Sequence, residues 1–124
     1  MQDSRILFLE YDRINAALIC EKLSECGYNV FQVHSASDAY LYLDQRRPLS
    51  VLITGIDLGS GDDGFAAARY ARALYPALKV IYVSAANLLA DAAERVAGST
   101  FLAKPYRAAD LLRELVGTGR LEIS

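Results

Sequence analysis

Residues 49–65 read LSVLITGIDLGSGDDGF, in which an apolar run leads into a loop rich in glycine and aspartate. The run at 49–54 predicts a buried strand, and the apolar spacing after the loop predicts a helix that ends before Pro76. Strand, loop and helix together form one β-α unit. The same alternation recurs along the chain, so this stretch sets the fold class.

Four further units surround this one. Strands are predicted at 5–10, 28–33, 79–84 and 100–103. Helices are predicted from an N-cap at Asp12 to Gly27, from an N-cap at Ser35 or Ser37 to about Arg47, over about 87–96, and around Ala108–Leu115. Five β-α units in strict alternation predict a parallel α/β sheet with helices on both faces and right-handed crossovers. We expect a single domain over residues 1–124 with no output domain.

Composition narrows the classes of function. The chain has 124 residues, 53% apolar and 23% charged, which is typical of a globular domain. A net charge of −2 argues against nucleic-acid binding, and no apolar run is long enough for a membrane span or a signal peptide. We therefore expect a cytoplasmic protein that binds neither nucleic acid nor membrane. Cys20 and Cys26 are expected to be reduced, with Cys20 in the core.

The loop also spells G-x-G-x-x-G between Gly59 and Gly64, the pattern of a dinucleotide-binding turn. That turn belongs in the first β-α unit, with an acidic residue about 20 positions later, where this chain has Ser84. Asp62 and Asp63 would also repel a pyrophosphate. The sequence therefore favours a connecting loop, in which these two aspartates form turns or helix caps.

Ligands of open α/β sheets bind at the carboxyl ends of the strands. Five segments of this chain fall there: residues 10–12, His34, the loop from Thr54, Ser84, and residues 104–105. His34 has no other metal-ligating residue at a useful spacing, so it is expected to be an ordinary histidine at a strand end.

Four of these segments, ILFLEYD (6–12), VLITGIDLGSGDDGF (51–65), VIYVSA (80–85) and FLAKPY (101–106), follow one another as in a known family. In order and spacing they resemble the receiver domain of two-component response regulators. The resemblance covers nearly the whole chain. It implies a flavodoxin-like, doubly wound fold with strand order 2-1-3-4-5 and five helices, and a signalling role rather than an enzymatic one.

Receivers typically accept a phosphoryl group on an aspartate at the end of the third strand, beside Mg²⁺ held by two acidic residues after the first strand. On this chain Glu10 matches the first acidic position, whereas Tyr11 falls on the second, and a phenol is a poor ligand for Mg²⁺. Gly55 falls on the acceptor position. Glycine has no side chain to phosphorylate.

The other positions of the family match. Ser84 and Lys104 fall on the residues that contact the phosphoryl oxygens, Phe101 on the aromatic that changes rotamer with state, and Pro105 on a proline usually preceded by a cis peptide bond. Without an acceptor carboxylate, Lys104 is expected to pair with Glu10 or Asp12 or to turn towards water. The Tyr11 ring is expected to fill the space left by the missing aspartate and metal.

These residues predict a degenerate receiver that acts in phosphorelay signalling as a phosphorylation-independent protein-interaction module, with no catalytic residues and no cofactor. The alternative is a receiver still phosphorylated on Asp57 with Mg²⁺, for which Glu10 and Asp12 are the candidate ligands. The resemblance implies protein partners (a histidine kinase, another regulator or an effector) docking on the expected fourth helix, fifth strand and fifth helix. A homodimer is a further alternative.

Overall fold

A computed structural model describes residues 5–85 and 93–119 of the chain. Its centre is one parallel sheet in the order β2-β1-β3-β4-β5. The strands are β1 (Arg5–Leu9), β2 (Asn29–Val33), β3 (Val51–Gly55), β4 (Lys79–Ala85) and β5 (Thr100–Lys104). The predicted parallel sheet and strand order are therefore confirmed.

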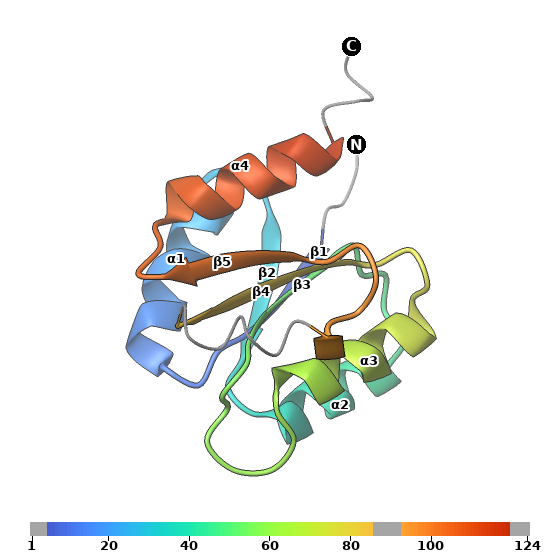
Figure 1. Cartoon of the computed structure of the whole chain (residues 1–124). Helices are drawn as coiled ribbons and strands as arrows, with labels where there is room; N and C mark the ends of the chain where they lie inside the picture. The colour runs from blue at the N-terminus through green and yellow to red at the C-terminus, as the bar shows by residue number, and fades with distance from the viewer. Residues whose placement is uncertain (1–4, 86–92, 120–124) are drawn as a thin grey trace.

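The helices form a layer on each side of the sheet, as Figure 1 shows. They are α1 (Arg13–Glu25), α2 (Ala36–Asp44), α3 (Gly64–Leu74) and α4 (Ala108–Gly119). Helices α1 and α4 cover one face, and α2 and α3 cover the other (Figure 1). Within the described part of the chain, no helix is long and apolar enough to cross a membrane.

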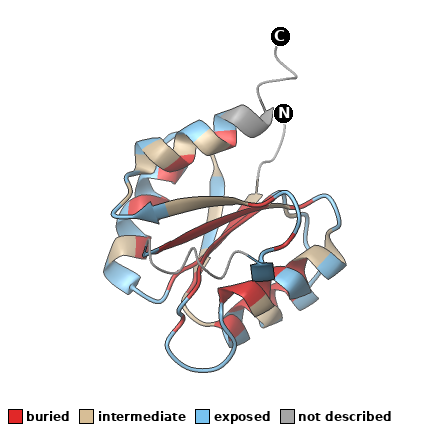
Figure 2. Ribbon diagram, in the orientation of Figure 1, coloured by how far each residue is buried: buried red, intermediate tan, exposed pale blue. Residues whose placement is uncertain are grey.

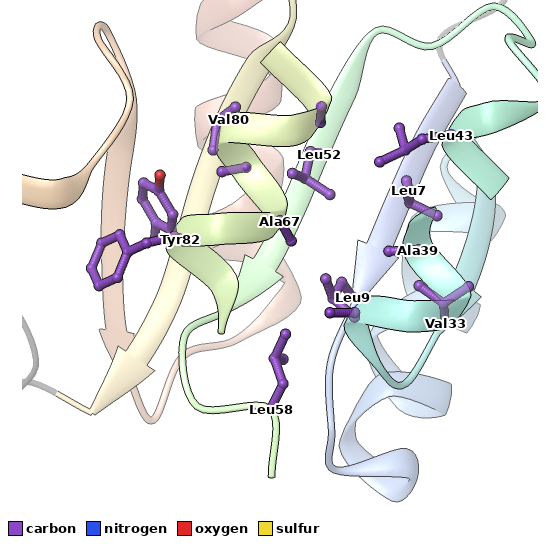
Figure 3. Packing of buried hydrophobic residues seen from close by; sticks show 14 of the residues in the cluster. Leu7, Leu9, Val33, Ala39, Leu43, Leu52, Leu58, Ala67, Val80 and Tyr82 are labelled. Atoms are coloured by element: carbon purple, nitrogen blue, oxygen red, sulfur yellow. The ribbon is translucent and has the colours of Figure 1, made fainter. Parts of the chain in front are cut away.

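The sheet is buried on both faces, which explains why its strands read as nearly continuous apolar runs. Alternate residues of each central strand point to opposite helix layers. Leu7, Leu52 and Val80 pack towards α2 and α3 (Figure 3), whereas Phe8 and Ile53 pack towards α1 and α4. The central strands are accordingly the most deeply buried part of the molecule (Figure 2).

The first three helices begin at polar side chains that cap their N-termini. The Asp12 carboxylate accepts hydrogen bonds from the backbone N–H groups of Ile14 and Asn15, both at 3.1 Å, so the predicted cap of α1 is confirmed. Ser35 caps α2 and Asp63 caps α3 in the same way. Both cysteines are free, with Cys20 buried as expected.

The second helix is shorter than predicted, because α2 ends at Asp44 and not near Arg47. The N–H groups of Gln45 and Arg46 bond to carbonyls three residues back, and Arg46 has a φ of 56°. This tight turn ends the helix before Pro48 can do so.

The expectation of five helices is wrong for the part of the chain that the structure describes, which contains four α-helices. Residues 86–92 of the expected fourth helix lie outside the described residues. Residues 93–96 are not α-helical. The Val96 N–H donates a hydrogen bond to the Tyr82 hydroxyl at 3.2 Å.

Candidate functional site

The carboxyl ends of the strands bring the predicted site residues to one edge of the sheet. Glu10 directly follows β1, Gly55 ends β3, Ser84 lies near the end of β4, and Lys104 ends β5. A pocket of about 360 Å³ opens at this edge, lined by Asp12, Asn15, Lys104, Pro105 and Tyr106.

Glu10 and Lys104 form an ion pair at this edge. The Lys104 ammonium lies 3.1 Å from Glu10 Oε1, and the other carboxylate oxygen accepts a hydrogen bond from the Asp12 N–H at 3.0 Å. Glu10 is only 2% exposed. Its Oε1 has no hydrogen bond among the described residues, so the ammonium is the group that compensates its charge. Lys104 thus pairs with one of its two expected partners.

Gly55 lies against this ion pair. A Cβ on residue 55 would meet Glu10 Oε1 at 3.7 Å and a Leu58 methyl group at the same distance, which is ordinary van der Waals contact. The backbone of residue 55 is held by its neighbour, because the buried Thr54 hydroxyl donates to the Gly55 carbonyl at 2.7 Å. The site therefore has room for a Cβ at residue 55, and that atom would face the Glu10 carboxylate.

Tyr11 does not occupy the space beside Gly55, so this prediction was wrong. Its side chain is 61% exposed, and its ring lies over Gly59 in the loop after β3. A Cβ on Gly59 would come within 2.7 Å of Tyr11 Cε1. The ring therefore packs on the outside of the loop, while Glu10 and Leu58 surround residue 55.

The two aspartates nearest the site are engaged in local turns. Asp12 caps α1, and the exposed Asp57 accepts a hydrogen bond from the Gly59 N–H at 3.1 Å. Neither carboxylate is paired with Lys104, because Lys104 forms its ion pair with Glu10. Asp62, expected to lie in a turn or a helix cap, accepts a hydrogen bond from the Tyr40 hydroxyl at 2.6 Å, which connects the loop to α2.

Ser84 and Phe101 lie on the two strands at the β5 side of the site. Ser84 is buried. The Phe101 ring stacks on Tyr82, with ring centroids 5.1 Å apart, and the Arg95 guanidinium lies 5.0 Å from the Phe101 ring centroid. The peptide bond between Lys104 and Pro105 is cis.

The sequence reasoning missed Asn15 and Tyr106, which form one wall of the pocket. The Asn15 amide donates to the Tyr106 hydroxyl at 3.3 Å, linking α1 to the segment after β5. Burial raises the pKa of Tyr106, and the nearby charge of Glu10 raises it further. The one available signal was the position of Tyr106, directly after the Lys-Pro pair at a strand end. His34, by contrast, is the strand-end residue that was expected, with Nδ1 lying 3.1 Å from the Glu10 carbonyl oxygen.

The sequence profile of the response regulator receiver domain matches residues 6–116, which include all the site residues above and the sheet except Arg5. This chain belongs to the response regulator receiver family. Receiver domains are signalling modules of two-component systems and interact with histidine kinases and other proteins. No curated protein matched the chain.

Solved structures show the same receiver fold. A response regulator receiver protein from Sinorhizobium medicae WSM419 is 26% identical, with a TM-score of 0.87 and 94% of each chain covered. The receiver domain of a sensor histidine kinase from Pseudomonas aeruginosa PAO1, which has a magnesium ion in its active-site cleft, is also 26% identical; its TM-score is 0.77, with 94% of this chain and 97% of that chain covered. The receiver domain of the hybrid histidine kinase CckA, 23% identical, matches with a TM-score of 0.78, covering 92% of this chain and 97% of that chain.

The structure describes two of the three elements of the expected docking face, namely the fifth strand and the fifth helix. Strand β5 and helix α4 correspond to the expected fifth strand and fifth helix. Most of the expected fourth helix falls on residues 86–92, outside the described residues. Across the described ranges, no group of three or more His, Cys, Asp or Glu side chains is placed to hold a metal ion.

Proposed function

We propose that this receiver domain acts in two-component signalling as a protein-interaction module that works without aspartyl phosphorylation. The observation that carries the proposal is the Glu10–Lys104 ion pair beside Gly55. In the receiver pattern Lys104 contacts a phosphoryl group and Glu10 helps to bind a cation. Here each of the two charged groups is neutralised by the other.

The residues at the pocket do not fit Mg²⁺. This ion takes near-octahedral oxygen ligands at about 2.0–2.1 Å, normally including one or two carboxylates. The Lys104 ammonium lies 3.1 Å from Glu10 Oε1, and Oε2 accepts the Asp12 N–H. Asp12 is itself used as the α1 cap. A cation bound to Glu10 would have to displace an ammonium from a buried carboxylate, so we expect no Mg²⁺ requirement.

Phosphorylation of Asp57 is the alternative. An acceptor there would have to leave its hydrogen bond with the Gly59 N–H and turn in towards Lys104. It would also need a divalent cation at a pocket where Glu10 is already paired. The local turn at Asp57 and the ion pair at Glu10 both favour the phosphorylation-independent function.

Partner binding would then use the face that receivers commonly use, here β5, α4 and the segment before β5. We propose a histidine kinase, another regulator or an effector as the partner. Phe101 lies on this face, packed against Tyr82 and Arg95. A partner that prefers one arrangement of this aromatic group would shift the population of states without any phosphoryl group.

Intact-mass measurement after incubation with acetyl phosphate and Mg²⁺ tests the proposal. We expect no gain of the about 80 Da that a phosphoryl group adds. A receiver with an aspartate at the acceptor position, treated in parallel, shows that the reagent works. An adduct that appears on the wild-type chain and disappears in Asp57→Asn would establish the alternative function.

Gly55→Asp sharpens the test. The Cβ fits, but the new carboxylate faces Glu10, so we expect a loss of about 1 kcal/mol in the free energy of unfolding in the absence of divalent ions. Adding Mg²⁺ should raise the melting temperature of Gly55→Asp and leave that of the wild type unchanged. Equal stabilisation of both proteins would mean that Glu10 already binds the ion, against the proposal.

A further inference from the structure

A second surface, away from the pocket, carries exposed apolar side chains. We call it the β2–α2 face and define it by Phe31, Asp38, Leu41, Tyr42 and Arg47, which line a groove of about 380 Å³. Phe31 is 49% exposed and Leu41 is 65% exposed. The inner side of α2 packs into the core through Ala39 and Leu43 (Figure 3), so Leu41 lies on the outer side of the helix.

The aromatic groups of this face are held in fixed positions. The Phe31 ring stacks on the Tyr42 ring, with centroids 4.7 Å apart and an angle of 26° between the planes. The Arg47 guanidinium lies 6.0 Å from the Tyr42 ring centroid on the same groove. Because the groove is preformed, a partner that covers Phe31 would order few additional groups on binding.

Strand β2 is an edge of the sheet and pairs only with β1 in the described part of the chain. Val33 uses its carbonyl towards β1, where it accepts the Glu10 N–H at 3.1 Å. Backbone groups alternate sides along a strand, so those of Val33 and Phe31 face β1, and those of Val30 and Gln32 face outwards. Among the described residues no hydrogen bond uses these outward groups, so they can pair with another strand.

The β2 edge also lacks the usual protection against such pairing. Charged side chains and prolines normally blunt an exposed edge, and Asn29–Val33 contains neither. The opposite edge differs, because β5 ends in Lys104 and has the Arg95 guanidinium over its Phe101 ring. Of the two edges, β2 is therefore the one open to another strand.

The pattern on the β2–α2 face is complementary to itself. Phe31 is the middle residue of β2, and Leu41 lies between Asp38, in the first turn of α2, and Arg47, beyond its last turn. A two-fold axis through the outer side of Phe31 would place the apolar side chains of one copy against those of the other. It would also bring Asp38 of each copy to Arg47 of the other. This charge arrangement points to a second copy of the chain rather than to an unrelated strand.

We propose that the β2–α2 face is a homodimer interface in which the β2 strands of two copies pair antiparallel about this axis. Val30 of one copy lies opposite Gln32 of the other, and each such pair exchanges its outward N–H and C=O groups. Phe31 faces Phe31 of the second copy at the position where antiparallel side chains approach most closely. The interface leaves β5 and α4 free, so it stands independently of the proposed function.

The first test is the oligomeric state by sedimentation velocity from micromolar to millimolar concentrations. We expect a monomer–dimer equilibrium in the wild type. Leu41→Lys should raise the dissociation constant roughly tenfold or more, because it places like charges at the centre of the interface. Leu18→Lys is the matched control, since Leu18 is similarly exposed, at 59%, but lies on α1. It should leave the equilibrium unchanged.

The second test uses charge reversal. Asp38→Arg alone sets two guanidinium groups against each other at each contact with Arg47 of the second copy, and Arg47→Asp alone sets two carboxylates against each other. Each variant should therefore be monomeric. In a mixed dimer of the two variants, each of the two contacts between positions 38 and 47 again joins a positive to a negative side chain, so the dimer should return. Among the described residues the Asp38 carboxylate accepts no hydrogen bond, and the Arg47 guanidinium contacts the Tyr42 ring. Circular dichroism checks that each reversal preserves the fold.

Each result decides the proposal. A wild-type monomer at all concentrations overturns it, as does a dimer that Leu18→Lys dissociates and Leu41→Lys does not. The double variant carries both reversals in one chain, so both contacts again join opposite charges. Its association, together with monomeric single variants, establishes the interface. Failure of the double variant to associate where the wild type does would exclude the two-fold contact between Asp38 and Arg47.

Discussion

Gly55 and Gly64 bound the same loop, yet the fold requires glycine at only one of them. A Cβ at residue 64 would lie 1.8 Å from the Gly55 carbonyl oxygen, whereas a Cβ at residue 55 would meet its nearest neighbours at 3.7 Å. Close packing of the start of α3 against the end of β3 explains Gly64. No comparable contact explains Gly55. Glycine is thus required by backbone contacts at residue 64, whereas at residue 55 a Cβ would fit.

The largest effect is expected for Gly64→Ala. The added methyl would overlap backbone atoms of Gly55 and Ile56, which cannot rotate away as a side chain can. We expect a loss of roughly 3 kcal/mol or more in the free energy of unfolding, measured by urea titration. Near-wild-type stability would show that the start of α3 moves easily and that the fold does not require glycine at residue 64.

Lys104→Met should have the next largest effect, because it leaves the buried Glu10 carboxylate without its counter-charge. The Lys104 side chain is 37% exposed, so we expect a loss of about 1–2 kcal/mol rather than the roughly 3–5 kcal/mol of a fully buried pair. The double variant Glu10→Gln with Lys104→Met should recover part of the loss in a double-mutant cycle. Strict additivity would mean that the two groups do not interact.

Gly59→Ala tests a third kind of glycine in the same loop. Gly59 has a φ of 89°, and its Cβ would also touch the Tyr11 ring. We expect a loss of about 1–2 kcal/mol, mainly from the backbone conformation. Because Tyr11 is exposed and can swing away, combining the change with Tyr11→Ala should restore little; a large recovery would assign the cost to the ring contact.

The smallest effect is expected for Gly55→Ala. The methyl group fits, and replacing glycine restricts the unfolded chain, so the free energy of unfolding should change by less than about 1 kcal/mol and can rise. The same urea titration, run beside Gly64→Ala, measures the contrast directly. A loss as large as that of Gly64→Ala would show that residue 55 is glycine for steric reasons.

The apolar periodicity was enough to predict the alternation of strands and helices, because it reflects burial on two faces of a parallel sheet. The sequence also identified the cap at Asp12 and left Ser35 or Ser37 as the cap of α2, because capping is a local interaction between a side chain and the next turn of backbone. The end of α2 was misplaced because the left-handed turn at Arg46 has no glycine to mark it.

Part of the site could also be predicted from the sequence, and part could not. The spacing of the segments placed Glu10, Gly55, Ser84 and Lys104 at one edge, because parallel strands end together. The pairing of Lys104 with Glu10 and the position of the Tyr11 ring over Gly59 could not be predicted from the spacing. Nor could the hydrogen bond between Tyr106 and Asn15, or the exposure of Phe31 on the β2 edge. These outcomes depend on rotamers and on contacts between segments far apart in the chain, which local pattern does not contain.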